Sequence, residues 1–458
     1  MKATTGRTLL LVLFVLVAGC LGGQPSTEGN GTFADPANDQ LGWENGYWYN
    51  EPISVDQSDG LSQAELDAWL ARSMARVEHL RQLEFERPVK VEVITREEHR
   101  KRTANETSED DTPSKNRWND EVWAALFISE ESNPIETEFK NVSGSAVLGF
   151  YKAGSDTIVI VTDDPEQSTV SNTTFVHELV HALQDQHFDI KAVKKGATTQ
   201  DKQLASNGLI EGEANYVEAL YLERCKAGTW ECVKSPKKAS GGSRGDVNLG
   251  ILVTIFQPYS DGPWFVHQQV ESSGWGAMNE LWKSPPVSSS AIIHGDGITS
   301  PVNVTVEDRA RNGWKTFEHG TDTVGEASIF TMFWYQQRQY NITATDTSNF
   351  GTKSGTYDTY DYRSQPSTGW VGDAVLPYQK DGEYGHVWVT EWATEADAEE
   401  FRTAYAAVIE GHGGNEVGQG TYVIPSGGFA DAYRVERSGT TVTVVNGPRL
   451  SDLNDIRP

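Results

Sequence analysis

Residues 177–181 read His177-Glu178-Leu179-Val180-His181, which is an H-E-x-x-H pattern. On an α-helix, residues four positions apart lie on the same side of the axis, so both imidazoles can bind one metal ion. Glu178 follows the first histidine and can reach a water molecule held by that metal. Apolar residues at helical spacing predict that this helix is partly buried: Phe175, Val176, Leu179, Val180, Ala182 and Leu183. We therefore expect His177 and His181 to bind Zn²⁺, with Glu178 as the general base.

A catalytic zinc site usually has three protein ligands, so a third ligand must lie elsewhere in the chain. His187 is one candidate, because its distance from His181 is the one found in metzincins. That pattern needs a glycine three residues after the second histidine, where the chain leaves the helix, and this chain has Gln184 there. On a continuing helix, His187 would lie about 240° around the axis from His181 and would face away from the metal.

The other candidate is Glu211, in the stretch Leu209-Ile210-Glu211-Gly212-Glu213-Ala214-Asn215-Tyr216. This stretch resembles the N-E-G-x-A-x-Y motif of the aminopeptidase N branch of the gluzincins, in which a Glu on a second helix binds the zinc. The matching positions are Glu211, Gly212, Ala214 and Tyr216, whereas Ile210 replaces the family's Asn. The resemblance implies that Glu211, rather than Glu213, is the third ligand. It also gives Asn215 the place where thermolysin-like enzymes carry an Asp that hydrogen-bonds a zinc-bound histidine.

The likeness extends over about residues 145–300. The run H-E-L-V-H-A-L-Q-D-Q-H-F-D, residues 177–189, is similar to that of a group of uncharacterised bacterial and archaeal zinc metalloproteases. Proteins of that group share a pattern of residue pairs downstream of the motif. The corresponding pairs in this chain are Pro258-Tyr259, Asp261-Gly262, Phe265-Val266, Gly274-Trp275, Pro285-Pro286 and Ile293-His294.

The resemblance implies hydrolysis of peptide bonds in a peptide or protein substrate, with one Zn²⁺ ion as the cofactor. Gluzincins stabilise the oxyanion with a Tyr or His from another segment, and Tyr259 and His294 are the two candidates. They also place an edge strand beside the metal helix, for which we expect Leu148–Tyr151 or Ile158–Val161. No G-x-M-E-N element precedes the helix, which favours an endopeptidase over an aminopeptidase.

Two other functions remain open. One is a catalytically inactive surface or binding lipoprotein that retains the metalloprotease fold. The other is a zinc hydrolase that acts on a non-peptide bond. The presence of Glu178 argues against the first, because a structural zinc site has no use for a general base and is usually closed by a fourth protein ligand.

The N-terminus resembles a bacterial or archaeal lipoprotein signal. Lys2 and Arg7 precede a short apolar run, and Val17-Ala18-Gly19-Cys20 resembles a lipobox. We expect residues 1–19 to be a signal peptide, Cys20 to carry a lipid and residues 20–58 to form a flexible tether. This organisation predicts a protein held on the extracellular face of the cell membrane by its lipid anchor.

The cysteines and the charge agree with an extracellular location. Cys225 and Cys232 are close in sequence and are a possible disulfide, with a second zinc site as the alternative. The formal net charge is −27 and the sequence pI is about 4.7, which argues against a nucleic-acid partner because phosphate would be repelled. Acidic residues spread over the whole chain are typical of halophilic proteins, and the chain resembles a haloarchaeal lipoprotein in this respect. An acidic extracellular protein without adaptation to salt is the alternative.

Hydrophobic periodicity predicts an α+β protein. The resemblance implies a gluzincin-like domain over residues 59–342, with a small mixed sheet, the H-E-x-x-H helix and the Glu211 helix. Length and composition predict a linker over 343–368 and a small α+β module over 369–458. The patterns predict helices at 61–85, 120–130, 205–226, 249–283, 322–340 and 395–409. They predict strands at 89–94, 146–151, 157–162, 386–390, 421–424, 432–435 and 440–445, and a charged loop at 97–116.

Overall fold

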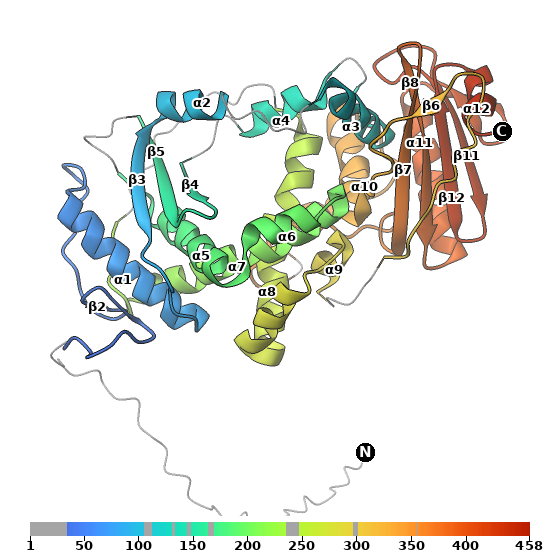
Figure 1. Ribbon diagram of the computed structural model, residues 1–458. Helices are drawn as coiled ribbons and strands as arrows, with labels where there is room; N and C mark the ends of the chain where they lie inside the picture. The colour runs from blue at the N-terminus through green and yellow to red at the C-terminus, as the bar shows by residue number, and fades with distance from the viewer. Residues whose placement is uncertain are drawn as a thin grey trace, which may run out of the picture.

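The computed structural model describes residues 34–104, 112–130, 133–143, 148–163, 169–234, 247–295, 301–353 and 355–458. Within these ranges the chain is a mixed α+β structure, with a small sheet beside the central helices and a larger sheet toward the C-terminus (Figure 1). The predicted signal peptide, residues 1–19, and the predicted lipidation site Cys20 lie outside these ranges. No helix in the described ranges is long and apolar enough to cross a membrane.

The first part of the chain combines a three-stranded sheet with a set of packed helices. Its strands are β3 (Lys90–Thr95), β4 (Gly149–Lys152) and β5 (Thr157–Thr162), and its order is β3-β5-β4. Its helices are α1 (Gln63–Arg81), α2 (Arg96–Ala104), α3 (Pro113–Ala125), α4 (Ile135–Ser143), α5 (Asn172–Phe188), α6 (Ile190–Gly196), α7 (Gln200–Lys226), α8 (Leu249–Lys283) and α9 (Ser289–His294). Strand β4 lies at the edge of this sheet, which confirms the first of the two expected edge strands.

The expected loop at 97–116 is wrong, because helix α2 occupies its first part and α3 begins at Pro113. The charged residues of α2 stabilise it through ion pairs one turn apart, Glu97 with Lys101 and Glu98 with Arg102. Arg102 also pairs with Glu92 of β3, so the helix is attached to the sheet. A charged stretch without apolar periodicity can therefore form an exposed helix when its charges pair one turn apart.

The C-terminal part is a seven-stranded antiparallel sheet with helices packed against it. The strand order is β6-β7-β8-β12-β11-β10-β9, from β6 (Lys315–Thr316), β7 (Trp370–Lys380), β8 (Glu383–Trp392), β9 (Asn415–Gly418), β10 (Thr421–Val423), β11 (Ala432–Ser438) and β12 (Thr441–Gly447). The helical elements of this part are α10 (Gly325–Tyr335), η2 (Gln336–Tyr340), η3 (Ser348–Gly351), α11 (Glu395–Gly411) and α12 (Leu450–Ile456).

Strand β7 is buried and was not expected from the sequence. Its Asp373 interrupts the apolar pattern, but the carboxylate accepts hydrogen bonds from the indoles of Trp370 and Trp388, each at 3.1 Å. A buried carboxylate is tolerated when its oxygens are satisfied in this way. These tryptophans lie in a hydrophobic core that also includes Trp118 of α3 and Ile251 of α8, so both helices pack against the C-terminal sheet.

Two segments that we expected to be a flexible tether (20–58) and a linker (343–368) pack, in part, against the helices. In the tether region the short strands β1 (Trp43–Glu44) and β2 (Tyr47–Trp48) contact α1, and Gly42 donates its N–H to Glu78 of that helix at 2.9 Å. In the linker region, Tyr362 is fully buried and donates to the carbonyl of Val253 in α8 at 2.7 Å. The folded structure therefore includes residues before 59 and within 343–368, while the domain boundaries stay a prediction.

Helices α7 and α8 approach each other closely at two glycines, Gly212 and Gly262. A Cβ atom placed on Gly212 would lie 2.5 Å from the backbone of Gly262, and one on Gly262 would lie 2.6 Å from the carbonyl oxygen of Gly208. Such distances are below van der Waals contact, so the two helices can approach this closely only because both positions are glycine.

We predict that Gly212→Ala destabilises the protein by about 1–3 kcal/mol, because the added methyl group must push α8 away from α7. Urea unfolding followed by circular dichroism measures the change. Gly276→Ala in α8 is the matched control, because a Cβ atom there meets no atom within 4 Å. Equal stability of the two variants would show that the helix contact is not tight.

Candidate metal centre

Helix α5 carries the H-E-x-x-H motif and runs unbroken through Phe188, where Asp189 adopts a left-handed conformation and ends it. Its apolar side, including Phe175, Leu179 and Val180, is fully buried in the core. Its polar side faces α7, and packing between the two helices brings Glu211 opposite the histidines.

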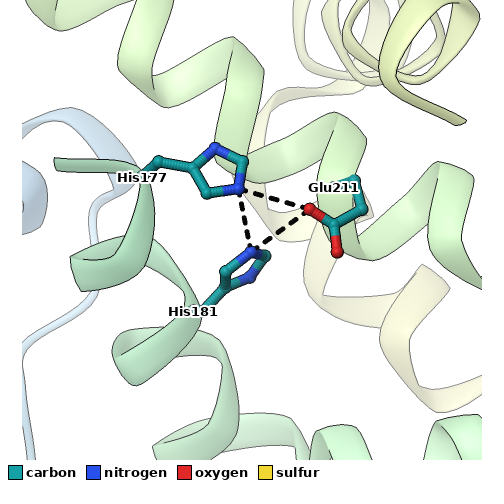
Figure 2. A group of neighbouring side chains, drawn as sticks. All are labelled: His177, His181 and Glu211. Atoms are coloured by element: carbon teal, nitrogen blue, oxygen red, sulfur yellow. Dashed lines mark hydrogen bonds and ion pairs between the residues drawn. The ribbon is translucent and has the colours of Figure 1, made fainter. Parts of the chain in front are cut away.

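His177, His181 and Glu211 point toward a common centre (Figure 2). The two Nε2 atoms lie 3.0 Å apart, and Glu211 Oε2 lies 3.2 Å from His177 Nε2 and 3.3 Å from His181 Nε2. Ligands at ordinary zinc distances in a tetrahedron lie about 3.3–3.6 Å from one another, so the observed separations are slightly shorter and compatible with a metal ion of this size. Within the described ranges, this is the one group of three such residues whose ligand atoms lie within 4.8 Å of one another.

The electrostatics of the cluster favour a cation between the three side chains. Burial opposes protonation of His177, but hydrogen bonds to Glu211 and Glu218 outweigh it and raise the pKa of His177 to about 10. Burial likewise opposes ionisation of Glu211, yet the neighbouring His181 and His177 hold the pKa of Glu211 far below its ordinary value. Positive charge is therefore stabilised at the place where the ligand atoms meet.

Outer hydrogen bonds orient both imidazoles. Gln184 donates its amide N–H to the carbonyl of Ile210 at 3.0 Å, which fixes the direction of the amide. Its Oε1 atom can then only accept, so Nδ1 of His181 donates to it at 2.9 Å and Nε2 keeps a lone pair that could bind a metal ion. Glu218 lies 3.5 Å from Nδ1 of His177 and orients the imidazole of His177 in the same way.

These partners differ from the one expected from the sequence. Among the hydrogen bonds of the described residues, none joins Asn215 to an imidazole, and Gln184 and Glu218 hold those places. Glu218 follows Glu211 by seven residues, two helical turns, so its position on the same face could have been found from spacing. Gln184 stands where metzincins carry a glycine, and its hydrogen bonds to His181 and Ile210 explain why this position is polar.

A cavity of about 260 Å³ adjoins the three side chains. Its lining comes from β4, α5, α6, α7 and α8: Gly149, Phe150, Tyr151, Ala153, His177, Glu178, His181, Ile190, Lys194, Ile210, Glu211 and Tyr259. Glu178 accepts a hydrogen bond from the backbone N–H of Tyr151 at 2.7 Å, so the edge strand holds this carboxylate in place.

Tyr259 is the oxyanion candidate that reaches this cavity. Burial, together with the carboxylates of Glu211 and Glu178, raises the pKa of Tyr259 above its ordinary value, so its hydroxyl keeps its proton. The other candidate, His294, is not part of the cavity lining and pairs with Glu326 at 3.0 Å. His187 faces away from the metal ligands as expected and bonds the carbonyl of Glu84 at 2.7 Å.

The rest of the motif run attaches α5 to its surroundings. Asp185 accepts hydrogen bonds from the hydroxyl of Tyr151, the N–H of Gly154 and the N–H of Ile190, at 2.9, 2.6 and 3.2 Å. The carboxylate thereby fixes the turn after β4 and the start of α6, which are two walls of the cavity. At the far end of α7, Cys225 and Cys232 form a disulfide with a Cα–Cα distance of 5.7 Å.

Comparison with known proteins informs only the C-terminal part. Residues 311–457 match the family model described as "Domain of unknown function (DUF8575)", which spans all strands of the seven-stranded sheet and none of the metal-site residues. No curated protein and no solved structure matches the chain.

We predict that Glu211→Ala abolishes tight zinc binding, because two histidines alone leave the metal without its third ligand. Purified protein dialysed against zinc and then against zinc-free buffer should retain one equivalent by elemental analysis, and the variant should retain almost none. His187→Ala, which removes a histidine outside the cluster, should retain zinc like the unaltered protein. Equal zinc in folded Glu211→Ala and unaltered protein would exclude Glu211 as a ligand.

Proposed function

We propose that this protein is a gluzincin-like zinc metallopeptidase that cleaves peptide bonds within polypeptide chains. The supporting observation is the convergence of His177, His181 and Glu211 beside a cavity that also contains the carboxylate of Glu178. A purely structural site would have no use for that acid. A bound Zn²⁺ ion lowers the pKa of its water molecule and polarises the substrate carbonyl.

Glu178 would act as the general base and then as the general acid. Its carboxylate accepts the proton of the attacking water and returns it to the nitrogen of the leaving amine. The backbone N–H of Tyr151 donates to Oε2, which restrains the side chain and leaves Oε1 for proton transfer.

Strand β4 supplies a surface for an extended peptide. Leu148 accepts a hydrogen bond from Val161, so pairing with β5 uses the main-chain groups of alternate residues beginning at Leu148. By this alternation Gly149 and Tyr151 direct their main-chain groups toward the free edge, and both line the cavity. The N–H of Tyr151 is already donated to Glu178, so a substrate strand would pair with Gly149 and with the carbonyl of Tyr151. A substrate strand added at this edge would cross the cavity beside Glu178.

The sequence of residues 1–20 supports a lipid anchor on the extracellular face of the membrane. The disulfide between Cys225 and Cys232 agrees with this proposal, because such bonds persist in oxidising compartments.

We predict that Glu178→Gln retains zinc and fold but lowers kcat by about 10²–10⁴-fold, because the amide cannot accept the proton of the water. The amide oxygen can still accept the N–H of Tyr151, so the variant keeps the local structure. Cleavage of casein and of short quenched peptides in concentrated salt measures the effect. Equal activity in both forms would contradict the role of Glu178, and zinc binding without any peptide cleavage would favour a binding protein or a different hydrolase.

We predict that Tyr259→Phe lowers kcat by about 10²–10³-fold with little change in KM, because one donor to the developing oxyanion is lost. Zinc content should be unchanged, since Tyr259 is not among the three ligands. His294→Phe is the matched control and should keep kcat within a few-fold, provided that circular dichroism shows an intact fold. The reverse result would move the oxyanion role to His294.

A further inference from the structure

We propose that the cavity selects substrates with an acidic side chain near the scissile bond, and that Lys194 of α6 binds this carboxylate. The inference rests on the proposed function and specifies the class of its substrate. It follows from the net negative charge of the chain, from the unpaired ammonium groups of the α6 lysines and from the position of α6 at the cavity.

Helix α6 is a local concentration of positive charge in an acidic chain. The chain contains 65 acidic and 38 basic residues, yet the helix reads Ile-Lys-Ala-Val-Lys-Lys-Gly and contains no acid. Its three lysines, Lys191, Lys194 and Lys195, are exposed, and in the described ranges none of them makes an ion pair or a side-chain hydrogen bond. Elsewhere many basic side chains are paired with acids, as Arg81 is with Glu213 and Arg449 is with Glu383.

The two acids that precede α6 in the sequence, Asp185 and Asp189, already accept hydrogen bonds from the backbone. Asp185 accepts the three hydrogen bonds that fix the β4–β5 turn and the start of α6. Asp189 caps α6 by accepting the N–H of Ala192 at 3.1 Å. These contacts hold the backbone of the helix in place and leave the ammonium groups for an external partner.

Lys194 lines the cavity that contains Glu178 and the metal-ligand cluster, together with Ile190 one turn earlier. A second hollow of about 680 Å³ lies next to it. Ala153 lines the first cavity, and the next residue, Gly154 in the turn after β4, lines the second hollow. Lys191 lines this second hollow. Helix α6 therefore presents ammonium groups to both hollows, on a wall that an extended peptide along β4 would pass.

An acidic side chain is the substrate feature that this wall recognises best. A carboxylate forms a charge-assisted hydrogen bond with an ammonium group, whereas a basic side chain is repelled. The net charge of −27 otherwise repels acidic polypeptides, so local cations are needed to attract them to the cavity. An exposed pair of this kind corresponds to a preference of about two- to fivefold.

The test uses quenched peptides that are identical except for Glu, Gln or Lys at each position flanking the cleaved bond. With the zinc-loaded protein we expect kcat/KM to fall in the order Glu, Gln, Lys at one position or more. In Lys194→Met the ratio of Glu to Gln peptides should fall to about one, and in Lys194→Glu the order should reverse. Lys195→Met is the control, because Lys195 lines neither hollow, and it should keep the original order.

A binding measurement separates this inference from the proposed function. Fluorescence anisotropy of the same peptides with zinc-loaded Glu178→Gln reports preference without turnover. Preferential binding of the Glu peptide without cleavage by the unaltered protein would contradict the peptidase function and keep the role of Lys194. Cleavage without a Glu preference, or the same preference in Lys194→Met, would overturn the role of Lys194 and leave the peptidase function standing.

Discussion

The contact between Gly212 of α7 and Gly262 of α8 is the constraint on which the candidate site depends. It places two helix backbones against each other with no side chain between them. Glu211 immediately precedes the first glycine, and Tyr259 lies three residues before the second. Close approach of the helices therefore brings the proposed third metal ligand and the proposed oxyanion donor to the same cavity. The pair Glu211-Gly212 meets two separate needs, since one residue supplies a carboxylate and the next allows the neighbouring helix to approach.

The buried polar side chains of α5 take positions in which they can form hydrogen bonds, because burying an unpaired polar group is costly. Gln184 and Gln186 are buried, and each uses its amide to contact another part of the chain: Ile210 of α7 for the first and the backbone at Glu86 and Arg87 for the second. Leaving such amides unpaired would cost about 1–3 kcal/mol each. The hydrogen bonds of both glutamines therefore stabilise the fold, and those of Gln184 also fix the orientation of the His181 ring.

Features that depend on spacing within one helix could be predicted from the sequence. Two histidines four residues apart share a face by helix geometry, and the placement of His187 away from that face follows from the same geometry. The choice between Tyr259 and His294 could not be predicted, because it depends on how α8 and α9 pack against α7. Strand β7 was missed for a related reason, since the partners of Asp373 are tryptophans that only the folded sheet brings to it.

Hydrogen bonds join the C-terminal sheet to the start of α7, the helix that carries the proposed ligand Glu211. The N–H of Gln200, the first residue of α7, donates to Asp322 at 3.0 Å, and the N–H of Asp201 donates to the carbonyl of Thr323 at 2.9 Å. Asp322 in turn exchanges backbone hydrogen bonds with Val375 of β7. The part of the chain that matches the domain of unknown function thus holds the N-terminus of the helix that carries Glu211. Because a helix moves largely as a rigid body, fixing this end limits how far Glu211 can shift from the two histidines. We infer that the sheet contributes to the candidate site by restraining α7, at a distance and without a residue in the cavity.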